Sequence, residues 1–157
     1  MRIGFGYDVH AFAEGLPMVI AGVRLDSPLG CVAHSDGDVA IHALCDALLG
    51  AIAAGDIGAH FPDSDPAYKG IDSTILLERT VEFLAKEGYK VGNVDITIAL
   101  ERPKLRPHID QMRARLAECL ATEVGNVSVK ATTTEKLGFT GRSEGVAAYA
   151  VALVERI

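Results

Sequence analysis

The sequence predicts a protein of the α+β or α/β class, on three observations. Apolar segments of strand length, some of them alternating, occur near both ends of the chain and in its middle. Three longer segments, with apolar residues three and four positions apart, are typical of amphipathic helices. No internal repeat, linker or change of composition divides the 157 residues, so we expect one domain, residues 1–157.

Two strands are expected before the first helix, Arg2 to His10 and Met18 to Leu25. Successive side chains of a strand point to opposite faces, so the first strand has one apolar and one polar face. We expect the apolar face to lie on the core. It comprises Ile3, Phe5, Tyr7 and Val9, and the other face comprises Gly4, Gly6, Asp8 and His10.

Three helices are expected. The segment from His34 to Gly58 contains the first, with Ser35 or Asp36 as N-cap and Gly55 as its end. The second is expected from Ile71 to Lys86. The third opens at Pro107, because proline is favoured in a first helical turn. The apolar stripe of the second is Leu77, Val81 and Leu84, and that of the third is Ile109, Met112, Leu116 and Leu120.

Three further strands are expected, at residues 94–100, 127–134 and 145–154. The last, GVAAYAVALV, is apolar on both faces. A strand of that kind is buried on both sides, either within one chain or at a subunit interface.

Composition excludes several classes of protein. Fifteen basic and twenty-one acidic residues give a net charge of 15 − 21 = −6, without a Lys/Arg run, which argues against nucleic-acid binding. Three scattered cysteines form no C-x-x-C pair, which argues against a thiolate zinc site or a disulfide framework. The most apolar window, Val39 to Ala54, is too short for a membrane span. With no signal-peptide pattern, we expect a cytoplasmic protein.

The stretch YDVH places two metal-ligating residue types on one face of the first strand. Asp8 and His10 are about 6.6 Å apart along it, close enough to share one ion. For an isolated D-x-H, a turn-capping Asp8 and an exposed His10 is the simpler interpretation.

His42 is the candidate third ligand. Asp38, His42 and Asp46 share one face of the first helix. A metal-bound histidine usually donates its other ring N–H to a carboxylate, and Asp46 is the candidate acceptor. The alternative is a buried histidine with a purely structural role. Two imidazoles and one carboxylate, with a fourth position open, are typical of catalytic zinc sites.

Four long motifs resemble the 2-C-methyl-D-erythritol 2,4-cyclodiphosphate synthase family: GYDVHAF, AHSDGDVAIHALCDALLGAIAAGDIGAHFPDSDPAYKG, ERPKLRPHI and KATTTEKLGFTGRSEG. The resemblance covers essentially the whole chain in order. It implies a mixed β-sheet with helices packed on one face. It further implies a homotrimer with its sheets facing inward and its active sites between subunits. It also implies that Asp8, His10 and His42 bind Zn²⁺.

The resemblance implies a lyase of the non-mevalonate route to isoprenoid precursors. Its substrate is 4-diphosphocytidyl-2-C-methyl-D-erythritol 2-phosphate, whose 2-phosphate attacks the β-phosphorus. CMP is released and 2-C-methyl-D-erythritol 2,4-cyclodiphosphate is formed. A phosphate monoester is already anionic near neutral pH, because its second pKa is about 6. Catalysis therefore rests on positioning and on neutralising charge.

The resemblance also implies roles for the residues at matching positions. It implies that His34 and Thr133 are catalytic residues and that Glu135 binds a second divalent ion, Mg²⁺ or Mn²⁺. The substrate-binding positions are Asp8, Val9, His10, His34, Ser35, Asp56, Ile57, Gly58, Phe61, Pro62, Asp63, Ser64, Asp65, Leu100, Glu101, Arg102, Pro103, Lys104, Leu105, Arg106, Thr132, Thr133, Thr134, Glu135, Phe139 and Arg142.

The acidity of these motifs independently calls for cations. Many of their carboxylates would face a polyanionic substrate, which cannot bind there without metal ions. The carboxylates are Asp8, Asp36, Asp38, Asp46, Asp56, Asp63, Asp65 and Glu135. For Glu135 the simpler interpretation is a surface carboxylate paired with Lys136. The resemblance also implies an isoprenoid diphosphate in a central cavity of the trimer, near Arg142 and Glu144.

Two other functions remain open on the residues alone. A phosphoesterase with zinc-bound hydroxide would use the same three ligands, and its product would be an open-chain phosphate. A protein that binds prenyl diphosphates around a structural metal would not turn over at all. A third alternative is a domain derived from a bifunctional chain. We expect no second activity in this chain, because 157 residues leave no room for one.

Overall fold

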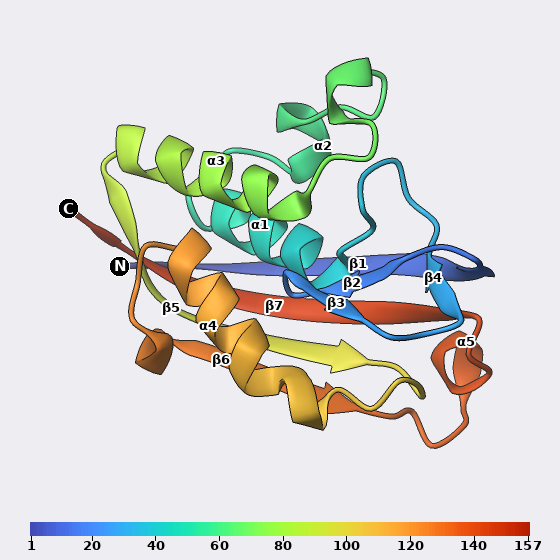
Figure 1. Cartoon of the computed structure of the whole chain (residues 1–157). Helices are drawn as coiled ribbons and strands as arrows, with labels where there is room; N and C mark the ends of the chain where they lie inside the picture. Colours follow the sequence, from blue (N-terminus) through green and yellow to red (C-terminus); the bar gives the residue numbers. More distant parts are fainter.

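The computed structural model describes residues 1–157 and contains a five-stranded sheet with helices against one of its faces (Figure 1). The strands lie in the order β4-β1-β7-β5-β6, and only β5 and β6 run parallel. The sheet is therefore mixed, as the resemblance implies. Its strands are β1 (Arg2–Glu14), β4 (Leu29–Cys31), β5 (Tyr89–Ala99), β6 (Val127–Thr132) and β7 (Gly145–Arg156).

Three long helices cover the sheet, and their predicted apolar stripes are confirmed. Leu77, Leu84, Met112 and Leu116 are fully buried, and Val81 packs against the same core. Five shorter helical segments join the elements. The long helices are α1 (Val39–Ala51), α3 (Ser73–Lys86) and α4 (Ile109–Cys119). The short segments are α2 (Ile57–His60), α5 (Gly138–Gly141) and the 3₁₀ turns η1 (Pro66–Tyr68), η2 (Arg106–His108) and η3 (Val124–Asn126).

The prediction for the two faces of β1 was wrong. The helices cover the glycine face, and a Cβ added to Gly4 or Gly6 would overlap the backbone carbonyls of α1. Without those Cβ atoms the helix backbone approaches the strand directly, so α1 packs on the polar face. The apolar face remains exposed in the single chain: Ile3 by 69%, Phe5 by 63%, Tyr7 by 44% and Val9 by 43%.

Strand β7 is apolar on both faces, as predicted. Ala148, Ala150 and Ala152 are fully buried on the helix side. Tyr149 and Val151 lie on the open side beside β1, and the rings of Tyr149 and Tyr7 are 5.1 Å apart. The open face of the sheet therefore presents a continuous apolar surface over β1 and β7.

The expected strand from Met18 to Leu25 is a hairpin of two strands, β2 (Met18–Ile20) and β3 (Val23–Leu25). Ala21 and Gly22 form its two-residue turn, with φ of 51° and 74°. This is the left-handed conformation that a tight hairpin turn requires. The carboxylate of Asp38 accepts hydrogen bonds from both turn N–H groups, at 2.8 and 2.7 Å.

Four helix boundaries differ from the prediction. Asp38, and not Ser35 or Asp36, caps α1, because its carboxylate also accepts the N–H of Ile41 at 3.1 Å. This helix ends at Ala51, before Gly55. Helix α3 begins at Ser73, capped by Asp72, and α4 begins at Ile109 after the 3₁₀ turn that contains Pro107. None of the helices is long and apolar enough to span a bilayer.

Candidate metal centre and substrate cavity

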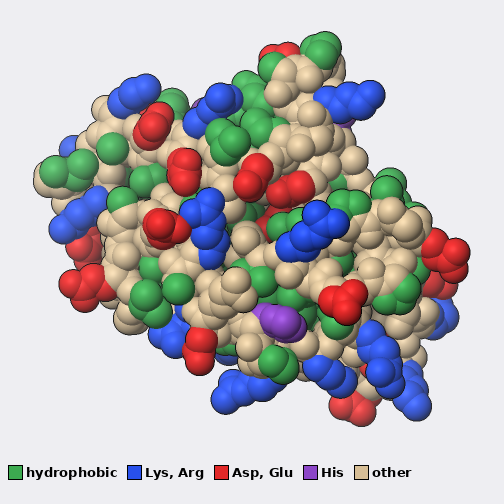
Figure 2. Space-filling view, in the orientation of Figure 1, with side chains coloured by type: hydrophobic (Ala, Val, Ile, Leu, Met, Phe, Trp, Pro, Cys, Tyr) green, Lys and Arg blue, Asp and Glu red, His purple; other side chains and the backbone are tan.

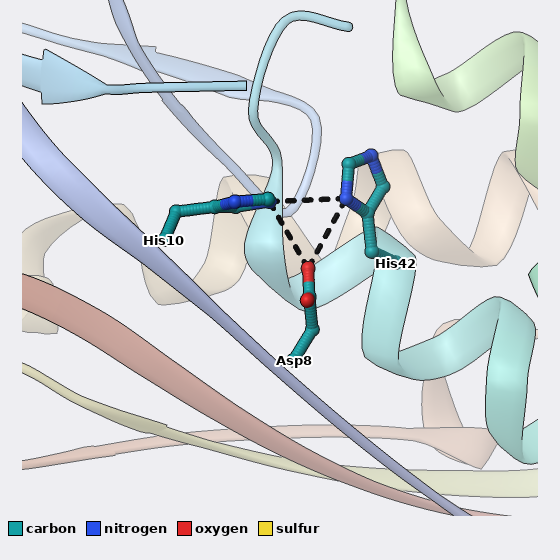
Figure 3. A group of neighbouring side chains, drawn as sticks. All are labelled: Asp8, His10 and His42. Atoms are coloured by element: carbon teal, nitrogen blue, oxygen red, sulfur yellow. Dashed lines mark hydrogen bonds and ion pairs between the residues drawn. The ribbon is translucent and has the colours of Figure 1, made fainter. Parts of the chain in front are cut away.

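Asp8, His10 and His42 converge on one point (Figure 3). The Nε2 atom of His10 lies 3.0 Å from Oδ2 of Asp8, and Nδ1 of His42 lies 3.1 Å from the same oxygen. The two ring nitrogens are 3.1 Å apart. The predicted set of three ligands is therefore assembled within a single chain.

The packing of α1 on β1 builds this triangle. Asp8 and His10 extend the glycine face of β1 by two more positions. Because Gly6 admits the helix backbone at Ala43, the preceding residue, His42, lies directly over the two strand ligands. The glycines of β1 therefore determine where His42 lies relative to the two strand ligands.

The donor set fits a zinc ion. A tetrahedral zinc with Zn–N bonds of about 2.0 Å has neighbouring ligand atoms about 3.3 Å apart. The three observed separations of 3.0 to 3.1 Å are close to that value. Two ring nitrogens and one carboxylate oxygen form one face of the tetrahedron, which leaves the fourth position for a ligand.

The charges of the group reinforce one another. Burial alone would raise the pKa of Asp8, but hydrogen bonds and positive charge from His10 and His42 outweigh it and hold that pKa well below its usual range. Burial alone would lower the pKa of His42, whereas its hydrogen bond and charge interaction with Asp8 raise it above the usual value. Asp8 is therefore ionised and ready to bind a cation at neutral pH.

The partner predicted for the second nitrogen of His42 was wrong. Asp46 accepts the N–H of Ile57 at 2.7 Å and does not contact His42. The Nε2 atom of His42 instead lies 2.9 Å from the Oγ of Ser73 and 3.1 Å from the Oγ of Ser35. The carboxylate of Asp46 is instead committed to the first residue of α2.

The ligand triangle lies on the wall of a cavity of about 360 Å³. Many residues predicted to bind substrate line it with the metal ligands: His34, Ser35, Ile57, Gly58, Phe61 and Asp63. Sequence reasoning missed the other lining residues, Val32, Ala33, Tyr68, Ile71 and Leu76. Tyr68 packs on the ring of Phe61 and comes from the same loop. A larger cavity, about 710 Å³, is lined by residues of α3, α4 and β5 and lacks such a ligand group.

The remaining loop residues have structural partners of their own. Asp56 caps α2 and Asp65 caps η1, each through one carboxylate oxygen. Pro62 and Ser64 are exposed on the same loop. The side chain of Val9 projects from the opposite face of β1, so only its backbone lies near the metal ligands.

Asp36 and Asp38 do not line this cavity. Asp38 is fully buried and committed to the hairpin turn and the cap of α1. Asp36 accepts hydrogen bonds from Ser73 and from the N–H of Asp38. The predicted cluster of eight carboxylates around the substrate is therefore smaller than the sequence indicated.

A second group of predicted residues gathers at the carboxyl ends of β5 and β6. The N–H of Leu100 donates to Thr132, and the carboxylate of Glu101 accepts the N–H groups of Thr134 and Lys136. The side chains of Leu100 and Leu105 are buried, so these residues can offer only backbone groups to a ligand. The exposed members of the group are Arg102, Lys104, Arg106, Thr132 and Glu135.

The positions beyond β6 are shaped by an unusual turn. Glu135 and Lys136 both have positive φ, 53° and 64°, and both side chains are exposed. Their carboxylate and ammonium groups form no ion pair with each other, whereas Arg142 pairs with Glu144 at 3.0 Å. Phe139 is 37% exposed at the start of α5. Glu135 is therefore an unpaired surface carboxylate, unlike the simpler interpretation offered by the sequence.

One chain does not bring the two groups together. His10 pairs with Val146 on β7, Ala147 pairs with Ala99 on β5, and Ala99 pairs with Thr132 on β6. The two groups thus stand at the same edge of the sheet, but three strand spacings separate them, about 14 Å. Within one chain, therefore, the two groups do not face a common site.

The chain is thus a protein of α/β architecture, with a mixed sheet covered on one face by helices and a candidate metal centre on the wall of a cavity. The chain belongs to the YgbB family, whose family model matches residues 1–155.

Relatives match the chain from end to end. A 2-C-methyl-D-erythritol 2,4-cyclodiphosphate synthase of Thioalkalivibrio sulfidiphilus is 63% identical over 155 residues, which are 99% of this chain and 97% of that protein. The enzyme of the same name from Bacillus cereus is 56% identical over 99% of this chain and 98% of its own length.

Solved structures agree in fold. A 2C-methyl-D-erythritol-2,4-cyclodiphosphate synthase described as a bound form with CDP is 38% identical, with a TM-score of 0.91 over 98% of this chain and 100% of that one. The bifunctional IspDF of Campylobacter jejuni is 40% identical, with a TM-score of 0.96 over 99% of this chain. The present chain spans only 42% of that bifunctional protein.

Proposed function

We propose that this protein is a lyase that converts 4-diphosphocytidyl-2-C-methyl-D-erythritol 2-phosphate into 2-C-methyl-D-erythritol 2,4-cyclodiphosphate and CMP, in the non-mevalonate route to isoprenoid precursors. The observation that carries this is the Asp8–His10–His42 triangle on the cavity wall. It occurs in a chain that matches enzymes of that name over its full length.

Three ligand atoms, one each from Asp8, His10 and His42, would hold zinc on the wall of the cavity. When bound, the ion supplies a Lewis acid that withdraws charge from a phosphate oxygen. A single exposed carboxylate suits a hard divalent ion, so Glu135 would hold Mg²⁺ or Mn²⁺.

The residues of the cavity position the nucleophile. The Nε2 atom of His34 is buried and has no partner within the chain, so it is free to hydrogen-bond to a phosphate oxygen. Ser35 lies beside it on the cavity wall. An oxygen of the 2-phosphate forms a bond to the β-phosphorus, and the bond from the β-phosphorus to the bridging oxygen breaks. The electron pair leaves with CMP, so no general base is needed.

The second group of residues holds the cytidine end. Backbone groups from Leu100 to Arg106 bind the cytosine, and Lys104 lies near the phosphates. Hydroxyls of Thr132 and Thr133 bind the α-phosphate, with Thr133 stabilising the transition state. Asp56 and Gly58 contact the ribose, and Phe61 to Asp65 close over the methylerythritol. Carboxylates suit sugar hydroxyls, which donate hydrogen bonds.

The separation of the two groups within one chain supports a homotrimer with its active sites between subunits. The open face of the sheet supplies the contact surface, because it exposes Phe5, Tyr7 and Tyr149 beside smaller apolar residues. Burying this face would also place apolar side chains around a central axis. Such a lining suits an isoprenoid diphosphate, with Arg142 near its charged end. A native mass spectrum without bound prenyl diphosphate would count against that ligand.

Product analysis tests the proposed reaction. We expect CMP release and a cyclic diphosphate in the phosphorus NMR spectrum, both lost after chelation and restored by zinc with magnesium. CMP together with open-chain phosphates alone would instead identify a phosphoesterase. Absence of turnover by folded, metal-loaded protein would leave a binding protein as the better account.

A further inference from the structure

The second nitrogen of His42 is held by a buried chain of hydrogen bonds. Its Nε2 atom lies 2.9 Å from the Oγ of Ser73, the first residue of α3. Ser73 is fully buried, and its hydroxyl donates to Oδ1 of Asp36 at 2.5 Å. The other oxygen of Asp36 accepts the backbone N–H of Ser73 at 3.0 Å. Asp36 therefore holds both donors of the same serine.

These contacts determine which atom donates in each hydrogen bond between Asp36, Ser73 and His42. A serine hydroxyl has one hydrogen, and Ser73 gives it to the carboxylate of Asp36. The Ser73 oxygen can then only accept from His42, so the imidazole proton must lie on Nε2. With its other nitrogen committed to Ser73, His42 binds a metal ion through Nδ1, on the side where Asp8 and His10 converge.

We propose that Ser73 and Asp36 are positioning residues that hold His42 in the tautomer with its proton on Nε2 and thereby set the zinc affinity of the site. The proposal rests on the metal centre of the proposed function. Residues that orient a ligating histidine typically change metal affinity by about 10-fold to 100-fold when they are removed.

Ser35 has a different position in this network. Its Oγ lies 3.1 Å from Nε2 of His42 and already accepts the N–H of Gly37 at 3.2 Å. Its hydroxyl hydrogen has no acceptor that would fix its direction, and its side chain lines the cavity. Ser35 can therefore contact a substrate in the cavity, whereas Ser73 is fully buried and contacts only protein atoms.

The first test compares zinc affinity in two matched variants. Ser73→Ala removes the acceptor for His42, and we expect zinc to bind about 10-fold to 100-fold more weakly in a competition with a chromophoric chelator. Thr74→Val removes the next hydroxyl of α3, which is also buried but bonds to Asp72 and Arg115 and not to His42. We expect unchanged zinc affinity in Thr74→Val. Equal affinities of the parent and Ser73→Ala, or equal losses in both variants, would overturn the proposal.

Asp36→Asn tests the other end of the chain. Both carboxylate oxygens of Asp36 accept hydrogen bonds, so an amide must direct its NH₂ group at a donor. We expect a comparable loss of zinc affinity, and little further loss when Asp36→Asn is combined with Ser73→Ala, because the residues act as one unit. Strictly additive losses would contradict a shared action through His42.

A spectroscopic measurement on the unmutated protein needs no variant to fold. Long-range ¹H–¹⁵N NMR of the zinc-loaded protein reports which ring nitrogen of His42 carries a proton. We expect a proton on Nε2 and none on Nδ1, and an unprotonated Nε2 or a protonated Nδ1 would overturn the proposal. A parent protein that binds no zinc at all would instead overturn the metal centre itself, and this inference with it.

Discussion

Gly6 of β1 lies directly against the backbone carbonyl of Ala43 in α1, so that even a methyl group on Gly6 would overlap that oxygen. The contact joins strand and helix backbones with no side chain between them. His42 is the neighbour of Ala43, and Asp8 is two residues beyond Gly6, so the same contact sets the geometry of the metal ligands. The closeness of the two elements is therefore a functional property as well as a packing one.

Gly6→Ala should separate α1 from β1 and damage both stability and metal binding. Overpacking of this kind typically costs about 1–3 kcal/mol, and we expect at least that loss in urea-induced unfolding. Zinc affinity should fall as well, because His42 moves with the helix. Gly125→Ala is the matched control, since an added Cβ there meets open space. Native zinc affinity in Gly6→Ala would show that the ligands do not depend on this contact.

His42→Ala and Asp63→Ala should separate metal binding from substrate binding. Loss of His42 leaves two protein ligands, so we expect zinc to be lost and turnover to fall by ~100-fold or more. Asp63 lines the cavity without touching the metal ligands, so Asp63→Ala should mainly raise KM. Metal analysis and steady-state kinetics of both variants check this. Full turnover and a full zinc content in His42→Ala would mean that the ligand assignment is wrong.

Zinc affinity should rise with pH. Interaction with Asp8 raises the pKa of His42 in the metal-free protein despite burial, so a proton competes with zinc at higher pH than at an ordinary histidine. The pKa of Asp8 is lowered, so Asp8 adds no competition near neutral pH. Titration calorimetry in buffers of different ionisation enthalpy should show protons released on binding, and fewer of them as pH rises. Affinity that is constant from about pH 6 to 8 would contradict this assignment.

The cysteines should be unreactive in the native protein. Burial raises the pKa of Cys31 and of Cys45 to about 12, and nearby carboxylates contribute in the same direction for Cys31. Cys119 is also buried. Because the thiolate is the reactive form, we expect a disulfide reagent such as DTNB to label none of the three until denaturant is added. Fast labelling of one thiol per chain under native conditions would show that its packing is looser than described.

Residue types and spacing made Asp8, His10 and His42 candidate metal ligands, and the family resemblance completed the set. Asp8 and His10 alternate with Val9 on a strand, and His42 lies on an apolar helix. The same alternation could not show which face of β1 the helices cover. That choice depends on Gly4 and Gly6, whose missing side chains let α1 approach, and on apolar residues that stay exposed in the single chain.

The support of His42 could not be read from the sequence either. Helical spacing places Asp46 one turn from His42, which made it the obvious acceptor. Its carboxylate is instead taken by α2, and Ser73 reaches His42 from a helix 31 residues further along the chain. The hairpin at Ala21 was missed for a related reason, since an alanine with positive φ is not a usual turn signal.

The most direct test of the account asks whether the two groups of residues act across subunits. His42→Ala damages the metal half and Thr133→Ala the cytidine half, so each variant alone should be nearly inactive. Refolded together, they should regain activity if they form the proposed trimer, because about one site in four would then combine two intact halves. Mixed oligomers seen by native mass spectrometry but no more active than either variant alone would contradict a site shared between copies of the chain.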